Sequence, residues 1–367
     1  MSSQERRKAP TLRDIAENAG VSLFTASVVL NGSRSNTRVS PVTRQRIQEV
    51  AHSLGYYPNA MARGLARRRL NTVGVLFGMI DPIGALTNPY SGAVLEGIVA
   101  AAFPFGNNVT LYGEPWQDTP QNAARFRDGR TDGIIVVAPT SESTVVERLT
   151  ALHIPLVTVA YCADTFGVPS VDVDNVAGIT LACAHLLDLG HRRIAHLTGN
   201  ADMVSVPVRR QAFEEAMARG GGIIEDGYVH VCAYSGDHAG EAVAALLSLP
   251  HVPTAIVAGN DAIAIAAMRA AQERGVRVPE DLSIIGFDDS PSAALVTPGL
   301  TTIRQPVREI GGKALGLLLD RIDNKDVPAR TYLMEPELIV RGSTSPLPGG
   351  RPIKGENTES ESERTSK

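Results

Sequence analysis

The sequence predicts a small all-α head followed by a two-lobed α/β body with parallel sheets. Its 367 residues exceed what one small core holds, which points to two or three packing units. Residues 1–70 show a helical spacing of apolar residues, whereas the chain from residue 72 alternates short apolar runs with amphipathic segments. The two regions therefore belong to different structural classes.

Charge also separates the two regions. Residues 1–70 contain 12 Lys or Arg and 4 Asp or Glu, a net charge of +8, while the remainder contains 23 and 35, a net charge of −12. The net charge of −4 for the whole chain hides this contrast. A compact basic segment on an acidic body predicts a polyanion-binding module joined to a unit with another task.

Three short helices are predicted in the head. Each begins at a residue that can cap it, and each ends at a turn signal. The caps are Thr11, Ser22 and Ser40, which precedes a proline, and the ends are Gly20, Asn31-Gly32 and Gly55. The first two helices, separated by Gly-Val-Ser, form a helix-turn-helix. We assign residues 1–57 to this domain and residues 58–71 to a hinge helix and linker.

The body is predicted to alternate strands and helices. Strands are expected at 72–77, 109–112, 133–138, 155–160, 193–198, 228–233, 254–258 and 282–287. Helices are expected near 90–103, 120–128, 142–152, 175–189, 207–219, 238–248, 260–274 and 305–323. Nearly continuous apolar strands alternating with helices indicate parallel sheets covered on both faces, and the length favours two lobes with a cleft between them.

The expected domain boundaries follow from this pattern. The body covers residues 72–342, with an N-lobe of about 72–162 and 291–322 and a C-lobe of about 163–290 and 323–342. Residues 343–367 are rich in Pro, Gly, Ser and Glu, which predicts a disordered tail.

Composition and motifs exclude several classes of protein. Apolar residues make up 43% and charged residues 20% of the chain, as in folded globular proteins. With neither a signal peptide nor a membrane span in view, we expect a cytoplasmic protein. Cys162, Cys183 and Cys232 have the wide spacing of reduced thiols. The usual nucleotide, hydrolase and metalloprotease motifs are missing, so we expect no enzyme, no cofactor and no metal site.

Several motifs together carry a resemblance to a known family. TLRDIAENAGVSLFTASVVLNG, VSPVTRQRIQEVAHSLGYYPNAMARGLARRR, VDVDNVAG, HLLDLGHRRIAHLTGN and IIGFDD occur in this order over about residues 10–342. This ordered set resembles the LacI/GalR family of bacterial transcription regulators. The resemblance implies a homodimeric repressor that binds a palindromic DNA operator and has an effector domain like the periplasmic sugar-binding proteins.

The second helix of such a module enters the major groove with its first residues at base edges. Leu23 and Phe24 are apolar at positions that the inward stripe leaves exposed, which favours base contact over packing of Phe24 on the first helix. The other predicted base contacts are Ser27 and Val28, and the phosphate contacts are Thr11, Ser22, Thr25, Asn31, Arg34 and Arg44. For Arg34 and Arg44, ordinary surface charge is an equally good interpretation.

The hinge and the cleft complete the expected sites. By resemblance, Leu65 is a wedge in the minor groove, with Asn59 and Ala62 beside it on the hinge. The alternative for Leu65 is burial against the body.

The resemblance also assigns Asp172, Arg209, Asn260 and Asp288 to the effector, with Tyr90 from the other lobe stacking on a sugar. Donors facing acceptors in this set suit the hydroxyls of a neutral carbohydrate. Trp116 could also stack, although simple packing is the better interpretation.

Two alternatives remain open at this stage. The effector could be a nucleobase or a phosphorylated metabolite, although a phosphate would call for more cations at the cleft than Arg209 alone. The chain could instead be a soluble sugar-binding or sugar-metabolising protein without a regulatory role, in which case the basic head would be incidental.

Overall fold

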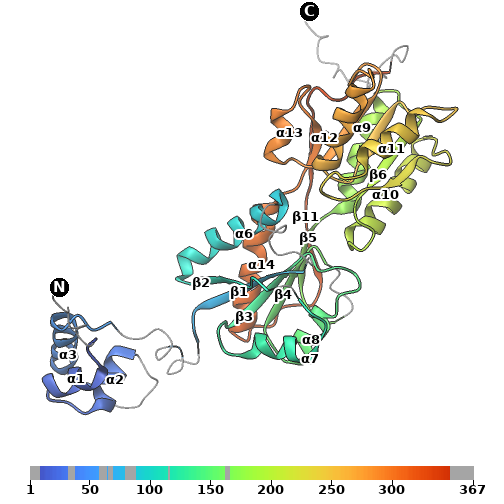
Figure 1. The fold of residues 1–367 in the computed structure, drawn as a ribbon. Helices are drawn as coiled ribbons and strands as arrows, with labels where there is room; N and C mark the ends of the chain where they lie inside the picture. The colour runs from blue at the N-terminus through green and yellow to red at the C-terminus, as the bar shows by residue number, and fades with distance from the viewer. Residues whose placement is uncertain are drawn as a thin grey trace, which may run out of the picture.

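A computed structural model describes residues 9–31, 38–57, 64, 69–78, 88–114, 116–161 and 166–347. Figure 1 shows a helical head near the N-terminus and two α/β lobes joined by strands that pass between them. This is the predicted fold class. Within the described ranges, no helix is long and apolar enough to cross a membrane.

The head contains α1 (Leu12–Asn18), α2 (Leu23–Asn31) and α3 (Pro41–Ser53). Thr11 caps α1 in a capping box with Asp14, and the Ser40 hydroxyl accepts a hydrogen bond from the backbone N–H of Thr43. The three helices pack around a small shared core made of Ile15, Ala19, Val29, Ile47 and Ala51. The predicted helices and their caps are therefore present.

The N-lobe contains a parallel six-stranded sheet in the order β11-β5-β4-β3-β1-β2. Its strands are β1 (Thr72–Phe77), β2 (Asn108–Leu111), β3 (Gly133–Val137), β4 (Leu156–Val159), β5 (Ser170–Val173) and β11 (Thr331–Met334). Its helices are α6 (Pro89–Ala102), α7 (Pro120–Ala124), α8 (Val145–Ala151) and α14 (Val307–Ile322), with 3-10 turns at Phe103–Phe105 and Arg125–Arg127. Helices α6 and α14 lie so close that a side chain at Gly97 would collide with the Arg308 carbonyl.

The C-lobe sheet has the order β12-β10-β9-β8-β6-β7, and only β12 runs antiparallel to its neighbour. Its strands are β6 (Ile194–Thr198), β7 (Val229–Val231), β8 (Ala255–Ala258), β9 (Ser283–Asp288), β10 (Thr301–Arg304) and β12 (Glu337–Ile339). Its helices are α9 (Asn175–Asp188), α10 (Ser205–Arg219), α11 (Ala239–Leu247), α12 (Asp261–Glu273) and α13 (Pro291–Leu295).

The described chain crosses between the lobes three times, after β5, after β10 and after β11. This corrects the predicted lobe boundaries. Strand β5 pairs with β4 and β11, so residues 170–173 and 331–334 belong to the N-lobe rather than the C-lobe. Strand β10 pairs with β9 and β12, and α13 packs on α12, so residues 291–304 belong to the C-lobe.

The predicted tail begins too early. The Ser343 side chain is fully buried, its hydroxyl donates to the Ile284 carbonyl at 2.5 Å, and the Leu347 N–H donates to the Leu189 carbonyl at 2.9 Å. Residues 343–347 therefore form part of the C-lobe, which we call the C-terminal strap. Residues 348–367 lie outside the described part of the chain.

Candidate functional site

The exposed surface of α2 carries two apolar side chains. Leu23 is 47% and Phe24 57% exposed, so Phe24 does not pack on α1. Thr11, Ser22 and Thr25 cap or brace the helix starts: the Ser22 hydroxyl accepts from the Thr25 N–H at 3.1 Å and lies 2.8 Å from its hydroxyl. Large exposed apolar residues at a helix start leave α2 ready for contact with another molecule.

Two residues of α2 differ from expectation. Val28 is 8% and Asn31 5% exposed, so protein atoms already cover the side chains predicted to reach DNA. The Ser27 hydroxyl accepts from the Asn31 Nδ2 at 3.1 Å and is still able to donate its own proton, and Ser27 is partly exposed. Leu23, Phe24 and Ser27 therefore remain as the accessible base-facing candidates. Arg34, Asn59, Ala62 and Leu65 lie outside the described residues.

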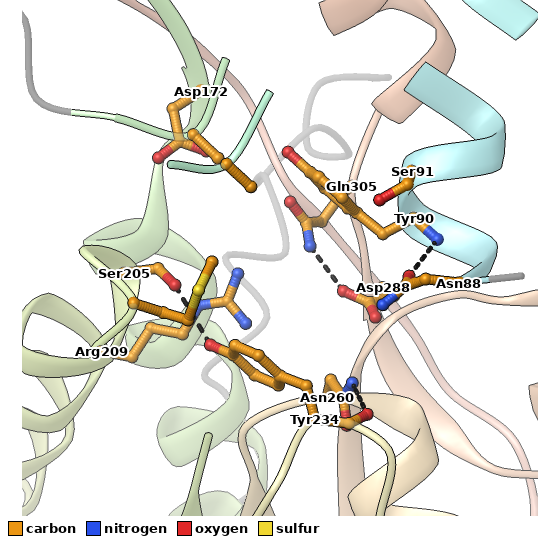
Figure 2. A pocket seen from close by; sticks show the side chains of 13 residues that line it. Asn88, Tyr90, Ser91, Asp172, Ser205, Arg209, Tyr234, Asn260, Asp288 and Gln305 are labelled. Atoms are coloured by element: carbon orange, nitrogen blue, oxygen red, sulfur yellow. Dashed lines mark hydrogen bonds between the residues drawn. The ribbon is translucent and has the colours of Figure 1, made fainter. Parts of the chain in front are cut away.

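A cavity lies between the two lobes. Figure 2 shows side chains from both lobes pointing into it. It is lined by Asn88, Tyr90, Ser91, Ala138, Ala160, Asp172, Met203, Ser205, Arg209, Tyr234, Asn260, Asp288 and Gln305. The cavity lies beyond the carboxyl ends of the parallel strands, where open α/β sheets bind their ligands. The structure thus brings together all five residues predicted for the effector.

Arg209 is the only cationic side chain among these lining residues. It is 6% exposed, its Nε donates to the Asn175 Oδ1 at 2.7 Å, and another guanidinium N–H donates to the Gly259 carbonyl at 2.6 Å. Its Cζ lies 3.7 Å from the centre of the Phe287 ring. Helix α10 begins at Ser205 rather than at the predicted residue 207, so Arg209 lies past the first turn of the helix. These bonds, rather than the helix terminus, hold it in place.

Asp172 and Tyr90 form the N-lobe side of the cavity. The Asp172 carboxylate accepts from the Val173 N–H at 2.8 Å and from the Asn175 Nδ2 at 3.0 Å. Tyr90 follows the Asn88 cap and Pro89 at the start of α6. Its buried hydroxyl has no hydrogen-bond partner within the described part of the chain. Tyr90 can therefore offer this hydroxyl to a ligand in addition to its ring face.

Asp288, at the end of β9, and Gln305, directly after β10, also line the cavity. The Gln305 Nε2 donates to the Asp288 Oδ1 at 2.5 Å, which leaves the buried Gln305 Oε1 without a partner among the described residues. Asp288 has φ 130°, and Ala138 and Ala160, at the ends of β3 and β4, have φ 47° and 55°. Strained non-glycine backbone of this kind gathers at ligand sites, where the surroundings must hold it in place.

Asn260 can offer less to a ligand than expected, because both polar atoms of its side chain already form hydrogen bonds within the protein. Its Oδ1 caps α12 by accepting from the Ile263 N–H at 2.9 Å, and its Nδ2 donates to the Tyr234 carbonyl at 2.9 Å. Asp261 is buried at the first position of α12, where its carboxylate accepts from the Thr302 hydroxyl and the Ser290 N–H.

The cavity carboxyl groups are held in a poorly solvating environment. Burial raises the pKa of Asp172 to about 6. Burial, together with the nearby Asp261 carboxylate, raises the pKa of Asp288 to about 7. Burial also raises the pKa of Tyr90 well above its ordinary value. A ligand that donates hydrogen bonds can stabilise these carboxylates.

The sequence did not single out several lining residues. Gln305 follows a strand that was not predicted, and Tyr234 and Ser205, whose hydroxyls lie 3.1 Å apart, come from a loop and a helix start with no motif. Of the three, only Tyr234 directly follows a predicted strand, 228–233, and this position is the signal that could have found it. Trp116 does not line the cavity but packs against Phe126 at 5.7 Å between ring centres.

Comparison with known proteins agrees with this architecture. The family described as bacterial regulatory proteins, lacI family, matches residues 11–59, and the periplasmic binding protein-like domain matches residues 183–344. Catabolite control protein A of Priestia megaterium is 33% identical over 337 residues, 91% of this chain and 99% of that protein. The HTH-type transcriptional repressor CytR of Escherichia coli strain K12 is 32% identical over 355 residues, 95% of this chain and 100% of that protein.

Solved structures show the same similarity. The lac repressor dimer bound to operator and the anti-inducer ONPF has a TM-score of 0.79 at 27% identity, covering 92% of this chain and 100% of that one. The complex of the transcriptional regulator CelR with cellobiose has a TM-score of 0.69 at 29% identity, covering 91% and 99%. The chain therefore belongs to the lacI family of bacterial regulatory proteins, and it is a DNA-binding transcriptional regulator.

Proposed function

We propose that this chain is a cytoplasmic, homodimeric repressor that binds a palindromic operator and whose DNA affinity is controlled by a neutral sugar held between the lobes. The head supplies the exposed α2, and the body supplies a cavity lined from both lobes. A ligand that contacts both lobes can shift their arrangement by its differential affinity for the two states.

The chemistry of the cavity carries the choice of a sugar. Two carboxylates, Asp172 and Asp288, line the cavity with a single guanidinium, two of whose N–H groups already donate to protein acceptors. The Gln305 Oε1 adds another acceptor. Hydroxyl groups donate to such acceptors without adding charge. The CelR complex contains cellobiose, which is consistent with a carbohydrate here.

A phosphorylated effector is disfavoured by the same arrangement. A phosphate would lie near Asp172 and Asp288 with only Arg209 to balance its charge. A nucleobase carries no such penalty and remains the second candidate, because Tyr90 and Tyr234 present aromatic rings to the cavity.

A thermal-shift experiment tests the class of effector. The full-length protein is heated with D-glucose, D-ribose, cellobiose, glucose 6-phosphate or adenine. A ligand at 100 times its Kd adds about 2.7 kcal/mol to the free energy of unfolding, so a neutral sugar is expected to raise Tm by several degrees. A Tm rise with adenine or glucose 6-phosphate, and none with the neutral sugars, would contradict the proposal.

Operator binding tests the DNA interface. A palindromic site selected from random DNA is titrated with wild type, Leu23→Ala and Phe24→Ala. Both variants are expected to lose about tenfold in affinity while keeping wild-type stability, since both side chains are exposed. Leu54→Ala is the control, because Leu54 is 41% exposed at the far end of α3. Equal losses in all three variants would exclude a specific role for α2.

A further inference from the structure

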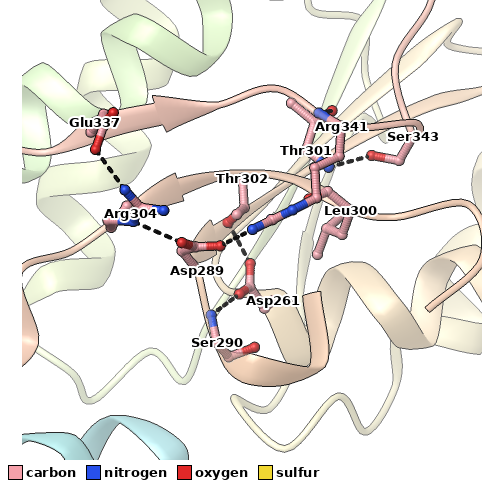
Figure 3. A network of polar contacts seen from close by, with 10 residues as sticks. All are labelled: Asp261, Asp289, Ser290, Leu300, Thr301, Thr302, Arg304, Glu337, Arg341 and Ser343. Carbon is pink, nitrogen blue, oxygen red and sulfur yellow. Dashed lines mark hydrogen bonds and ion pairs between the residues drawn. The ribbon is translucent and has the colours of Figure 1, made fainter. Parts of the chain in front are cut away.

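We infer that Arg304 is a positioning residue that ties the wall of the effector cavity to two of the segments crossing between the lobes. The inference relies on the proposed function only in taking the cavity as the effector site. It concerns three successive residues, Asp288, Asp289 and Ser290, and the groups that hold them. Figure 3 shows the groups that hold Asp289 and Ser290.

Four side chains hold these three residues, two of them on Asp289. Asp288 accepts from the Gln305 Nε2 at 2.5 Å. Asp289 pairs with Arg304 at 2.8 Å and with Arg341 at 2.5 Å. The Ser290 N–H donates to the Asp261 carboxylate at 2.6 Å. The end of β9 is therefore fixed residue by residue, directly at the cavity.

Backbone geometry explains why this support is needed. Asp288 has φ 130° and Asp289 has φ 56°, both in the region that side-chain-bearing residues rarely adopt. The Asp289 side chain is only 10% exposed, so two guanidinium groups compensate its carboxylate in a partly desolvated place. Arg304 and Arg341 thus hold the backbone turn that aims Asp288 at the cavity.

Arg304 occupies a particular place in the fold. It is the last residue of β10, directly before the crossing to α14, and its register partner on β9 is Asp288. Its other guanidinium nitrogen lies 2.8 Å from Glu337, the first residue after the crossing from β11 to β12. The Arg304 side chain therefore links Asp289, the neighbour of the cavity residue Asp288, to Glu337 after one crossing, while Arg304 itself lies directly before another.

The Arg304 contacts are better suited to transmitting movement than to stabilising the fold. The Arg304 and Glu337 side chains are 46% and 65% exposed, and such surface pairs contribute little to the stability of a fold. A planar guanidinium nevertheless fixes the direction between its two partners. A ligand group that moves Asp288 would also move Asp289, and Arg304 would pass this displacement to Glu337 and the crossing segments.

A double-mutant cycle in the full-length, ligand-free protein tests the inference. Hydrogen exchange is measured on peptides covering residues 334–339 in wild type, Asp288→Asn, Arg304→Gln and the double variant. We expect Asp288→Asn to change the exchange rate of these amides by at least about threefold when Arg304 is present, and by less than about 1.5-fold in the Arg304→Gln background. A purely structural role would change the rates without this dependence on background.

The control cycle replaces Arg304→Gln with Arg277→Gln, which breaks a similarly short ion pair with Asp281 away from the crossings. Asp288→Asn is expected to have its full effect in that background. The inference is overturned if Asp288→Asn changes exchange equally with and without Arg304, or if it leaves residues 334–339 unchanged in both. Neither sugar nor operator is present, so this outcome is independent of the thermal-shift and operator tests.

Discussion

Arg209 serves both the fold and the cavity. Its guanidinium satisfies the Asn175 side chain and the Gly259 carbonyl and covers the Phe287 ring, while it faces the cavity. A residue placed this way cannot be removed without leaving buried polar groups unpaired. Loss of effector binding in an Arg209 variant must therefore be separated from loss of stability.

Arg209→Ala is expected to lower the free energy of unfolding by about 2–4 kcal/mol, because it removes two buried charge-assisted hydrogen bonds. Arg210→Ala is the matched control. Arg210 is the exposed neighbour, paired with Glu214 at 2.9 Å, and its loss should stay within about 0.5 kcal/mol. Urea denaturation of the two variants measures the difference, and similar losses in both would contradict the structural role assigned to Arg209.

The cavity carboxyl groups predict a pH dependence of stability. The folded-state pKa of Asp288, about 7, lies above its unfolded value of about 3.9, so the folded protein binds more protons between these values. Stability contributed by this group is fully present below about pH 4 and is lost progressively as pH rises to the folded-state pKa of about 7. Asp288→Asn should therefore raise Tm more at pH 8 than at pH 5.

Asp281→Asn provides a control of opposite sign. Its hydrogen bonds to Arg277 lower the pKa of Asp281 to about 2, so its stabilising effect is already complete at pH 5. The variant should change Tm equally at pH 5 and pH 8. Calorimetric scans at the two pH values measure the Tm of both variants. A pH-independent effect of Asp288→Asn would show that burial does not destabilise the ionised Asp288 carboxylate.

Among the elements, the C-terminal strap has the clearest measurable role. The buried Ser343 hydroxyl accepts from the Thr301 N–H at 2.8 Å, and the Ser345 carbonyl lies 3.0 Å from the His191 Nε2. A chain ending at residue 342 should lose several degrees in Tm relative to a chain ending at residue 347, because these buried groups lose their partners. Circular dichroism melting of the two truncated proteins compares them directly, and equal Tm values would refute the assignment.

The sequence predicted those elements whose signal is strong within the element itself. Strands such as β3, GIIVV, and β8, AIVA, are continuous apolar runs that only a doubly covered sheet explains. The missed strands β5, β10, β11 and β12 are three or four residues long and contain polar side chains, as in SVDV and TTIR. Their strand form depends on partners distant in the chain, so a local pattern could not reveal them.

The cavity residues were likewise predictable where the signal lay in the neighbouring sequence. Residues directly after predicted strands, such as Asp288 and Asn260, were found with the help of family motifs. Gln305 was missed because its strand was missed, and the burial of Val28 was missed because helical spacing does not report what covers a residue from outside its own helix.

At the scale of the whole molecule, the charge of the head predicts a salt-dependent interaction. Arg13, Arg44 and Arg46 lie on the described helices of a segment with a net charge of +8. The logarithm of operator affinity should fall linearly with the logarithm of salt concentration, with a slope of about −0.9 for each phosphate neutralised. Fluorescence anisotropy between 50 and 200 mM salt measures this slope, and a flat line would remove the basic head from the interface.

Arg44→Gln and Arg46→Gln refine this prediction. Each should weaken binding to all DNA sequences alike and reduce the slope by about 1 if the side chain contacts a phosphate. Arg127→Gln in the body is the control and should leave both quantities unchanged. An unchanged slope in both head variants would assign these arginines to the free surface.

The three crossings between the lobes also govern how the protein is made. Strand β11 is the outer neighbour of β5, and β12 is the outer neighbour of β10, so the two sheets are completed by consecutive strands near the end of the chain. A nascent chain that has emerged only as far as residue 330 presents two open sheet edges, which readily pair with other chains. The N-lobe sheet gains its last strand, Thr331–Met334, only shortly before the C-lobe sheet gains Glu337–Ile339. Synthesis interrupted late would thus be more hazardous for this protein than synthesis interrupted within the head.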